Sequence, residues 1–177
     1  IFDRIPPVFA AMVRALSAGE GVFINVWDEK MKAEACAVLA AYDALNEHVE
    51  FFQHPSNEPW CRDHGPVFVK NETRRAIVDW DYNAWGEKYP PYDLDNEIPA
   101  RIAEVRGLSS FKPGMILEGG SIDVNGAGTL LTTESCLLNP NRNPDLSLGQ
   151  IEQRLRDFLC ADKIIWLREG ISGGDTD

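Results

Sequence analysis

Hydrophobic positions recur every three or four residues in four stretches of the chain, which is the spacing of one face of an α-helix. In the first stretch the apolar stripe is formed by Val8, Met12 and Leu16. Asp28 begins the second stretch and Ser147 the fourth, and both residue types accept hydrogen bonds from the first free N–H groups of a helix. The pattern predicts helices over residues 8–16, 28–45, 98–105 and 147–159.

Short apolar runs between turn-forming residues predict β-strands. They lie at residues 22–27, 49–52, 67–69, 76–80, 115–117, 121–124, 129–132 and 163–167. The third and fourth strands are expected to form a hairpin around Asn71, and a glycine-rich turn at 125–128 joins the sixth and seventh. The segment around Trp60 and the polar, aromatic segment 82–94 are predicted to be loops.

The order of these elements repeats along the chain. A helix, a strand, a glycine-containing loop and a hairpin recur with a period of roughly 50 to 60 residues. Repeats of this kind can surround an axis, so that corresponding loops converge on one central site. The order predicts an α/β fold of repeated units, with a generic α/β sandwich as the alternative.

Two of the loops carry residues suited to binding a flat cation. Asp63 precedes Gly65-Pro66, which forces a turn and lifts the carboxylate away from the following strand, and Trp60 adds a large aromatic face. Glu118 ends an apolar run and precedes two glycines, which allow a ligand or another backbone to approach closely. We expect the loops of Asp63 and Glu118 to face one cleft.

Each of these residues also has a purely structural interpretation. Asp63 could pair with its neighbour Arg62 or cap a turn, Trp60 could belong to the core, and Glu118 could bond to nearby backbone amides. Two further arrangements remain open at this point. Cys61 and His64 could act as a nucleophile and its base, or could bind zinc together with a third residue, His54, although the spacing fits no standard zinc site.

The composition excludes some classes of function. The 177 residues carry a net charge of −11, which argues against a nucleic-acid partner because phosphates require a basic face. No apolar run approaches the length of a membrane span, so no membrane partner is expected. The four cysteines are widely spaced and form no CxxC pair, which favours free thiols in a cytoplasmic protein. We expect neither a metal nor a cofactor.

Four ordered motifs resemble those of the agmatine deiminases, within the bacterial peptidylarginine-deiminase-like family of the guanidine-modifying (pentein) superfamily. They are W-x-R-D-x-G-P at 60–66, D-x-x-x-N-x-W-G at 79–86, E-G-G-S/N-I-x-x-x-G at 118–126 and T-x-x-C-L-L-N-x-N-R-N at 133–143. The resemblance implies an α/β propeller of ββαβ-type units around a pseudo-five-fold axis. It also implies a hydrolase that converts a guanidinium to a ureido group and ammonia without a metal, in putrescine biosynthesis.

The resemblance assigns roles to three residues of this chain. Trp60 and Asp63 match substrate-binding positions, and Glu118 matches the acidic residue of the E-G-G turn; Asp63 and Glu118 are the expected catalytic carboxylates, and all three are expected to bind substrate. The family's His, second Asp and nucleophilic Cys have no counterpart here. None of Cys36, Cys61, Cys136 and Cys160 matches the nucleophile. Residues 1–177 are therefore expected to be an incomplete deiminase domain, truncated at both ends and inactive alone.

Three functions remain to be distinguished. The first is a parent enzyme that acts on agmatine, the second is one that acts on peptidyl-arginine or free arginine, and the third is a module that binds guanidinium groups without catalysis. The expected partner in each case is a small cationic guanidinium compound, and homo-oligomerisation is left open.

Overall fold

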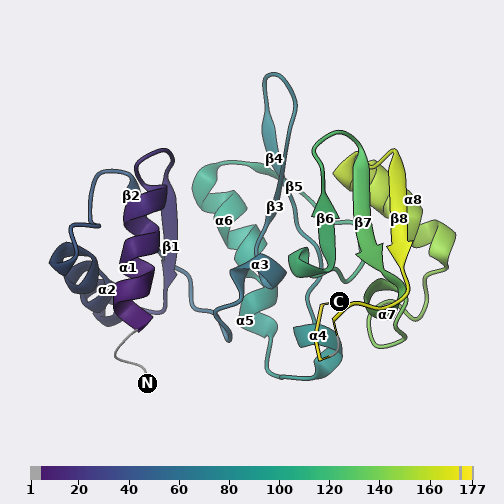
Figure 1. Ribbon diagram of the computed structural model, residues 1–177, viewed down its shortest axis with the longest axis horizontal. Coiled ribbons are helices and arrows are strands. Elements are labelled where there is room, and N and C mark those ends of the chain that lie inside the picture. Colours follow the sequence, from purple (N-terminus) through teal and green to yellow (C-terminus); the bar gives the residue numbers. More distant parts are fainter. Residues whose placement is uncertain (1–4, 172, 177) are drawn as a thin grey trace. The chain divides into compact units, whose positions relative to one another are not determined.

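The computed structural model describes residues 5–171 and 173–176, and the chain forms two units, residues 1–55 and 56–177 (Figure 1). In the first unit, helix α1 (Ile5–Leu16), strand β1 (Val22–Val26), helix α2 (Glu29–Ala41) and strand β2 (Val49–Gln53) alternate, and the two strands pair in parallel. Asp28 caps α2 as expected, because its Oδ1 accepts a hydrogen bond from the N–H of Met31 at 2.8 Å.

The buried face of α1 is not the one that the spacing predicted. Val8 and Met12 of the predicted stripe are exposed, whereas Ala10 and Val13 pack against Leu39. The helix carries apolar residues around most of its surface, so periodicity alone could not identify the inner side. The buried face is the one that carries Ala10, whose small side chain allows α1 to pack closely against Leu39 of α2.

The second unit contains two successive ββαβ motifs. In the first, β3 (Val67–Lys70) and β4 (Arg75–Val78) form an antiparallel hairpin, and α6 (Ile98–Arg106) leads to β5 (Ser109–Phe111), which pairs with β4 in parallel. In the second, β6 (Ile122–Val124) and β7 (Thr129–Thr133) form the hairpin, and α8 (Leu148–Leu159) leads to β8 (Lys163–Leu167), parallel to β7. The shared topology confirms the repeat.

Short turns of helix occupy segments that were predicted as loops, or that had no prediction. They are α3 (Cys61–His64), α4 (Ala84–Glu87), α5 (Asp93–Asn96), the 3₁₀ turn η2 (Gly119–Ser121) and α7 (Glu134–Leu137). The prediction of loops at Trp60 and at 82–94 was therefore incomplete. A turn of four residues is too short to show a hydrophobic period, which is why the sequence pattern missed it.

Residues 115–117 do not form the predicted strand. Ile116 makes a single bridge to Asp81, and the side chain of Asn143 takes both of its backbone hydrogen bonds. The amide of Asn143 accepts from the N–H of Ile116 at 2.9 Å and donates to its carbonyl at 3.0 Å, as a strand neighbour would. An asparagine side chain therefore replaces a strand, and the apolar run gave no sign of it.

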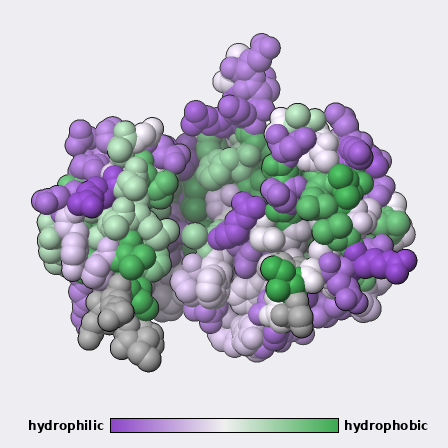
Figure 2. Space-filling model, viewed as in Figure 1, coloured by the Kyte–Doolittle hydropathy of each residue, from purple (hydrophilic) through white to green (hydrophobic). Residues whose placement is uncertain are grey.

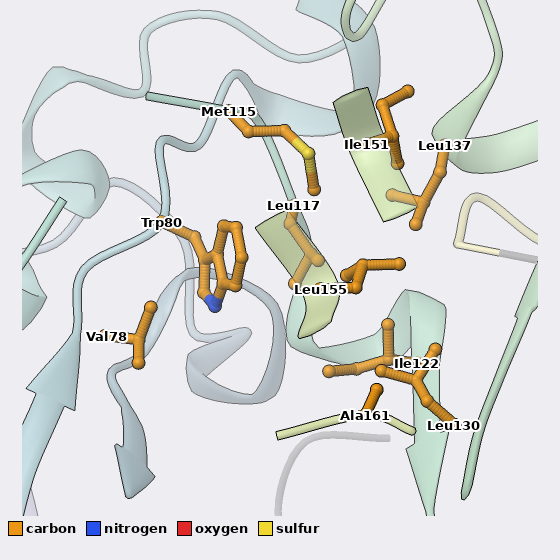
Figure 3. Close-up of a cluster of buried hydrophobic side chains, with 10 residues drawn as sticks. All are labelled: Val78, Trp80, Met115, Leu117, Ile122, Leu130, Leu137, Ile151, Leu155 and Ala161. Carbon is orange, nitrogen blue, oxygen red and sulfur yellow. The ribbon is translucent and has the colours of Figure 1, made fainter. Parts of the chain in front are cut away.

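The main core lies between α8 and the sheet of the second ββαβ motif. Figure 3 shows its ten buried side chains, in which Ile151 and Leu155 of α8 point towards residues from the sheet and from the segment before η2. Burying a side chain of this size contributes about 1.5–3 kcal/mol. Strand β8 is covered less well than the middle of the unit, since Ile165 and Leu167 are exposed.

The turn of the first hairpin is polar. Residues 70–75 project from the unit in Figure 1, and this tip is hydrophilic in Figure 2. Of the helices in the described ranges, none has the length and apolar character needed to cross a membrane.

Candidate guanidinium site

The turn α3 presents two different faces. At about 100° per residue, Trp60 and Asp63 lie on one side of the turn, and Cys61 and Arg62 lie on the other. Gly65 closes the turn by donating its N–H to the carbonyl of Cys61 at 3.0 Å. A Cβ on Gly65 would lie 2.2 Å from that oxygen, so only glycine fits. The glycine was expected to force this turn, and the contact gives the reason.

The face with Trp60 and Asp63 borders a cleft of about 400 Å³. Trp60 is 57% exposed, which excludes it from the core and leaves its ring available for stacking. The cleft is lined by aromatic and acidic residues and one threonine, namely Glu58, Trp60, Asp63, Trp85, Tyr89, Asp175 and Thr176.

Asp63 is held by two hydrogen bonds from different loops. Its Oδ1 accepts from the N–H of Gly120 at 3.0 Å, and its Oδ2 accepts from Nε1 of Trp85 at 3.1 Å. A Cβ on Gly120 would lie 2.2 Å from Oδ1 of Asp63, so the glycine is required for this contact. The structural interpretation with Arg62 is wrong, because the Arg62 guanidinium donates instead to the carbonyl of Ile122.

Glu118 lies fully buried behind Asp63 and does not line the cleft. The two loops meet as expected, but only one of the two carboxylates faces the open space. The Nε of Arg142 donates to Oε1 of Glu118 at 2.8 Å, and the Sγ of Cys136 lies 3.7 Å from Oε2. Burial raises the pKa of Glu118 above its ordinary value, and the charge of Arg142 opposes the rise.

Arg142 joins three segments of the site. Besides Glu118, its guanidinium contacts Oδ1 of Asn141 at 2.8 Å and the carbonyl of Asp175 at 3.0 Å. Asp175 also pairs with Lys88. The segment after β8 therefore runs back past α7 to α4, as Figure 1 shows. The sequence pattern did not reveal this role of Arg142, although an arginine between two asparagines was a signal.

The turn α4 presents Trp85 to Asp63 through an unusual backbone. Ala84, Trp85, Gly86 and Glu87 all have positive φ, between 50° and 82°. The side chain of Asn83 fixes this left-handed turn, because it accepts from the N–H of Gly86 at 2.9 Å and donates to the carbonyl of Asn141 at 2.9 Å. Trp85 had no assigned role, but its place in the D-x-x-x-N-x-W-G motif was the available signal.

The alternative chemistry at Cys61 and His64 does not fit the geometry. Cys61 lines a separate hollow of about 490 Å³ beside β3 and β6, not the cleft of Asp63. His64 is buried, and its Nε2 lies 3.1 Å from the carbonyl of Glu58. Within residues 5–171 and 173–176, no three His, Cys, Asp or Glu side chains are grouped to hold a metal ion.

Cys136, the buried thiol beside Glu118, is a poor nucleophile. Burial, and then the neighbouring carboxylate, raise its pKa to about 12, so the thiol keeps its proton at neutral pH. Its neighbour Thr133 caps the turn α7 by accepting from the N–H of Cys136 at 3.2 Å. The cysteine is therefore a packing residue of the C-L-L-N motif.

Known proteins share both the sequence and the fold. The model of the Porphyromonas-type peptidyl-arginine deiminase family matches residues 1–177. A Legionella pneumophila (strain Paris) protein named "Putative agmatine deiminase" is 38% identical over 178 residues, which cover 99% of this chain and 49% of that protein.

Two solved structures are similar as well. The agmatine deiminase of Enterococcus faecalis has a TM-score of 0.82 at 35% identity, covering 95% of this chain and 46% of that one. An agmatine deiminase of C. jejuni with substrate bound has a TM-score of 0.81 at 32% identity, covering 99% and 50%. The chain has a mixed α/β fold and spans about half the length of the curated relatives it matches. It belongs to the Porphyromonas-type peptidyl-arginine deiminase family.

Proposed function

We propose that the protein containing this chain hydrolyses the guanidinium group of agmatine. One water is consumed, the guanidinium carbon becomes the carbonyl carbon of a ureido group, and one nitrogen leaves as ammonia. The observation that carries the proposal is Asp63. Its carboxylate lines an aromatic cleft, both oxygens are oriented by N–H donors, and no cation of the described residues pairs with it.

Asp63 and Trp60 would bind and orient the substrate. Each carboxylate oxygen of Asp63 accepts one hydrogen bond from the protein and keeps a lone pair for a substrate N–H. The planar guanidinium matches such a carboxylate with two parallel bonds. Trp60 would stack on the flat face of the cation, a contact worth about 0.5–2 kcal/mol. Together they would present the guanidinium carbon to a nucleophile.

Glu118 would act through its charge from behind Asp63. Arg142 favours its charged form, and burial keeps water from screening that charge at the reacting centre. A negative charge there stabilises a protonated group that gives its proton to the departing ammonia. Neither that proton donor nor the thiolate that attacks the carbon is assigned to a residue of this chain.

We propose that the two ββαβ motifs belong to a pentein propeller and that residues 1–177 form part of one deiminase domain. The support is the repetition itself. The turn α3 precedes the first hairpin, η2 precedes the second, and the two meet where Asp63 contacts Gly120. Corresponding loops of successive units thus converge, as they do around an axis.

We favour agmatine over arginine and peptidyl-arginine as the substrate because the Legionella pneumophila relative and the Enterococcus faecalis structure are named agmatine deiminases, although other similar structures are named arginine or peptidyl-arginine deiminases. Its product, N-carbamoylputrescine, is a precursor of putrescine, and the proposal includes a cytoplasmic location. A binding module without catalysis is the second candidate. It would use the same aromatic cleft and the same carboxylate of Asp63 to bind a guanidinium group without turnover.

The test is ammonia release from agmatine by the protein containing this chain, with Asp63→Asn as the variant. The amide would turn an N–H₂ donor towards Trp85 or Gly120, both donors themselves, and would remove the charge. We expect kcat/KM to fall by roughly 100-fold or more. Asp123→Asn, at an exposed carboxylate on β6, is the matched control and should keep normal turnover.

The outcomes separate the candidates. Near-normal turnover by Asp63→Asn would remove Asp63 from the site. If the unsubstituted protein binds agmatine but releases neither ammonia nor a ureido product, the binding module replaces the enzyme.

A further inference from the structure

Glu58, a second acidic residue of the cleft, has a backbone that is fixed from both sides. Its N–H donates to Oδ1 of Asp95 at 3.1 Å, and its carbonyl accepts from Nε2 of His64 at 3.1 Å. Pro59 follows and restricts the backbone of Glu58 further. The backbone of Glu58 is therefore held in place at the edge of the cleft.

The support beneath Glu58 is buried and polar. Asp95 is fully buried, and its Oδ1 also accepts from the N–H of Asn57 at 2.6 Å. The side chain of Asn57 returns the contact by accepting from the N–H groups of Leu94 and Asp95 at 2.9 and 3.3 Å. Burying a carboxylate is costly unless hydrogen bonds compensate it. The reciprocal clamp satisfies Oδ1 of Asp95 and holds the loop that carries Glu58, whereas Oδ2 of Asp95 has no hydrogen-bond partner among the described residues.

The side chain of Glu58 lines the same cleft as Asp63. It is half-buried, and its carboxylate makes no hydrogen bond or ion pair within the described part of the chain. Its charge contributes, after burial and the charges of other carboxylates, to the raised pKa of Tyr82. Tyr82 contacts Trp85 edge to face with ring centroids 5.6 Å apart. Glu58 shares the cleft with the aromatic residues Trp60, Trp85 and Tyr89.

The charges of the cleft do not balance. Asp175 pairs with Lys88, which leaves Glu58 and Asp63 without a cation from the described residues. In the proposed function, Asp63 binds the guanidinium group of the substrate. Glu58 then offers a second anion to the far end of the same molecule. A ligand with a cation at each end would satisfy both, and a ligand with a carboxylate at its far end would meet like charge.

We propose that Glu58 is the specificity-determining residue of the cleft, and that it selects guanidinium compounds whose other end is an amine over those that carry a carboxylate. This inference rests on the proposed function and extends it to the far end of the substrate. Diamine-type guanidines such as agmatine are accepted, and free arginine is disfavoured by repulsion between its carboxylate and Glu58.

The test compares agmatine with 1-butylguanidine, which has the same chain length and guanidinium but no ammonium group. In the protein containing this chain, Glu58→Gln should lower kcat/KM for agmatine roughly tenfold. The same variant should change turnover of 1-butylguanidine by less than about twofold. Glu58→Gln should also lower the ratio of kcat/KM for agmatine to kcat/KM for arginine. Glu72→Gln, on the exposed hairpin tip, is the matched control and should alter none of these values.

Equal losses for agmatine and 1-butylguanidine would overturn the proposal, since Glu58 would then act on the guanidinium end or on folding. Unchanged kinetics with both compounds would overturn it as well. Failure of the proposed function looks different, because then the unsubstituted protein would convert neither compound. In that case, calorimetric binding of the two compounds to the unsubstituted and Glu58→Gln proteins tests the same selectivity without turnover.

Discussion

Arg142 and Glu118 form a buried ion pair whose two members have opposite electrostatic needs. Burial favours the neutral form of Glu118, and the guanidinium 2.8 Å from Oε1 favours the charged form. The protonation state of Glu118 is thus decided by a residue from another loop. Removing either partner of such a buried pair costs about 3–5 kcal/mol, because the other charge is left uncompensated.

Replacing Arg142 by glutamine should raise the pKa of Glu118 further, because the opposing charge is lost. If catalysis uses the charged carboxylate, the acid limb of the pH profile of kcat/KM should move to higher pH. Arg142→Lys keeps the charge and should shift the limb less. An acid limb that stays in place in a folded Arg142→Gln variant would separate Glu118 from the chemistry.

Stability gives a second measurement of the same effect. A carboxyl whose pKa is higher in the folded chain than in the unfolded chain binds its proton more tightly when folded. The free energy of unfolding should therefore fall as the pH rises from the ordinary pKa of a glutamate, about 4.3, towards the folded-state pKa of Glu118. In urea unfolding, Arg142→Gln should show a larger total fall, which continues to higher pH.

Among the elements, α4 shows how a short motif replaces a regular structure. Left-handed residues other than glycine cost roughly 1–2 kcal/mol each, and α4 contains three of them, Ala84, Trp85 and Glu87. Asn83 and Gly86 make the turn feasible, the first by capping it and the second by its missing side chain. The bond that Trp85 makes to the charged Asp63, worth about 1.5–3 kcal/mol, offsets part of this cost.

The space around Gly86 can be tested against a matched glycine. A Cβ on Gly86 would lie 2.3 Å from Nδ2 of Asn141, and Gly107, with a similar positive φ, has open space around it. Gly107→Ala should cost only the backbone strain, about 1–2 kcal/mol. Gly86→Ala should cost roughly 1 kcal/mol more and should also displace Asn141, which lowers activity. Equal losses in urea unfolding would show that the contact is unimportant.

Prediction from sequence succeeded where a periodic pattern or a defined turn was present. The caps at Asp28 and Ser147, the hairpin around Asn71 and the repeated order all appear in the fold. It failed where a side chain takes the place of backbone, as Asn143 does for Ile116. The sequence identified the two candidate loops, but not how deeply each carboxylate is buried. The burial of Glu118 depends on its pairing with Arg142, which comes from another loop.

At the scale of the whole molecule, the second ββαβ motif buries its helix α8 more completely than its strand β8. Ile151 on α8 has no exposed surface, whereas Ile165 on β8 is 37% exposed. Ile151→Ala should lower the free energy of unfolding by about 2–5 kcal/mol. Ile165→Ala should lower it by clearly less, because less surface is buried and less cavity is left. Similar losses would mean that β8 is covered in solution by something else.

The net charge of −11 is also a property of the whole chain. A negative molecule raises the local concentration of small cations and speeds their encounter with the cleft. The effect depends on ionic strength, so it concerns the rate of association and not the selectivity assigned to Glu58.

The contact of Gly120 with Asp63 also has an evolutionary consequence. Each residue lies at the entrance to a different repeat, and no flexible side chain stands between the backbone of one and the carboxylate of the other. A copy of a repeated unit is usually free to diverge once it has its own core. Here a substitution at Gly120 would displace Asp63 directly, and the reverse also holds. The sequences of the two repeats are therefore expected to change in a correlated way at these positions.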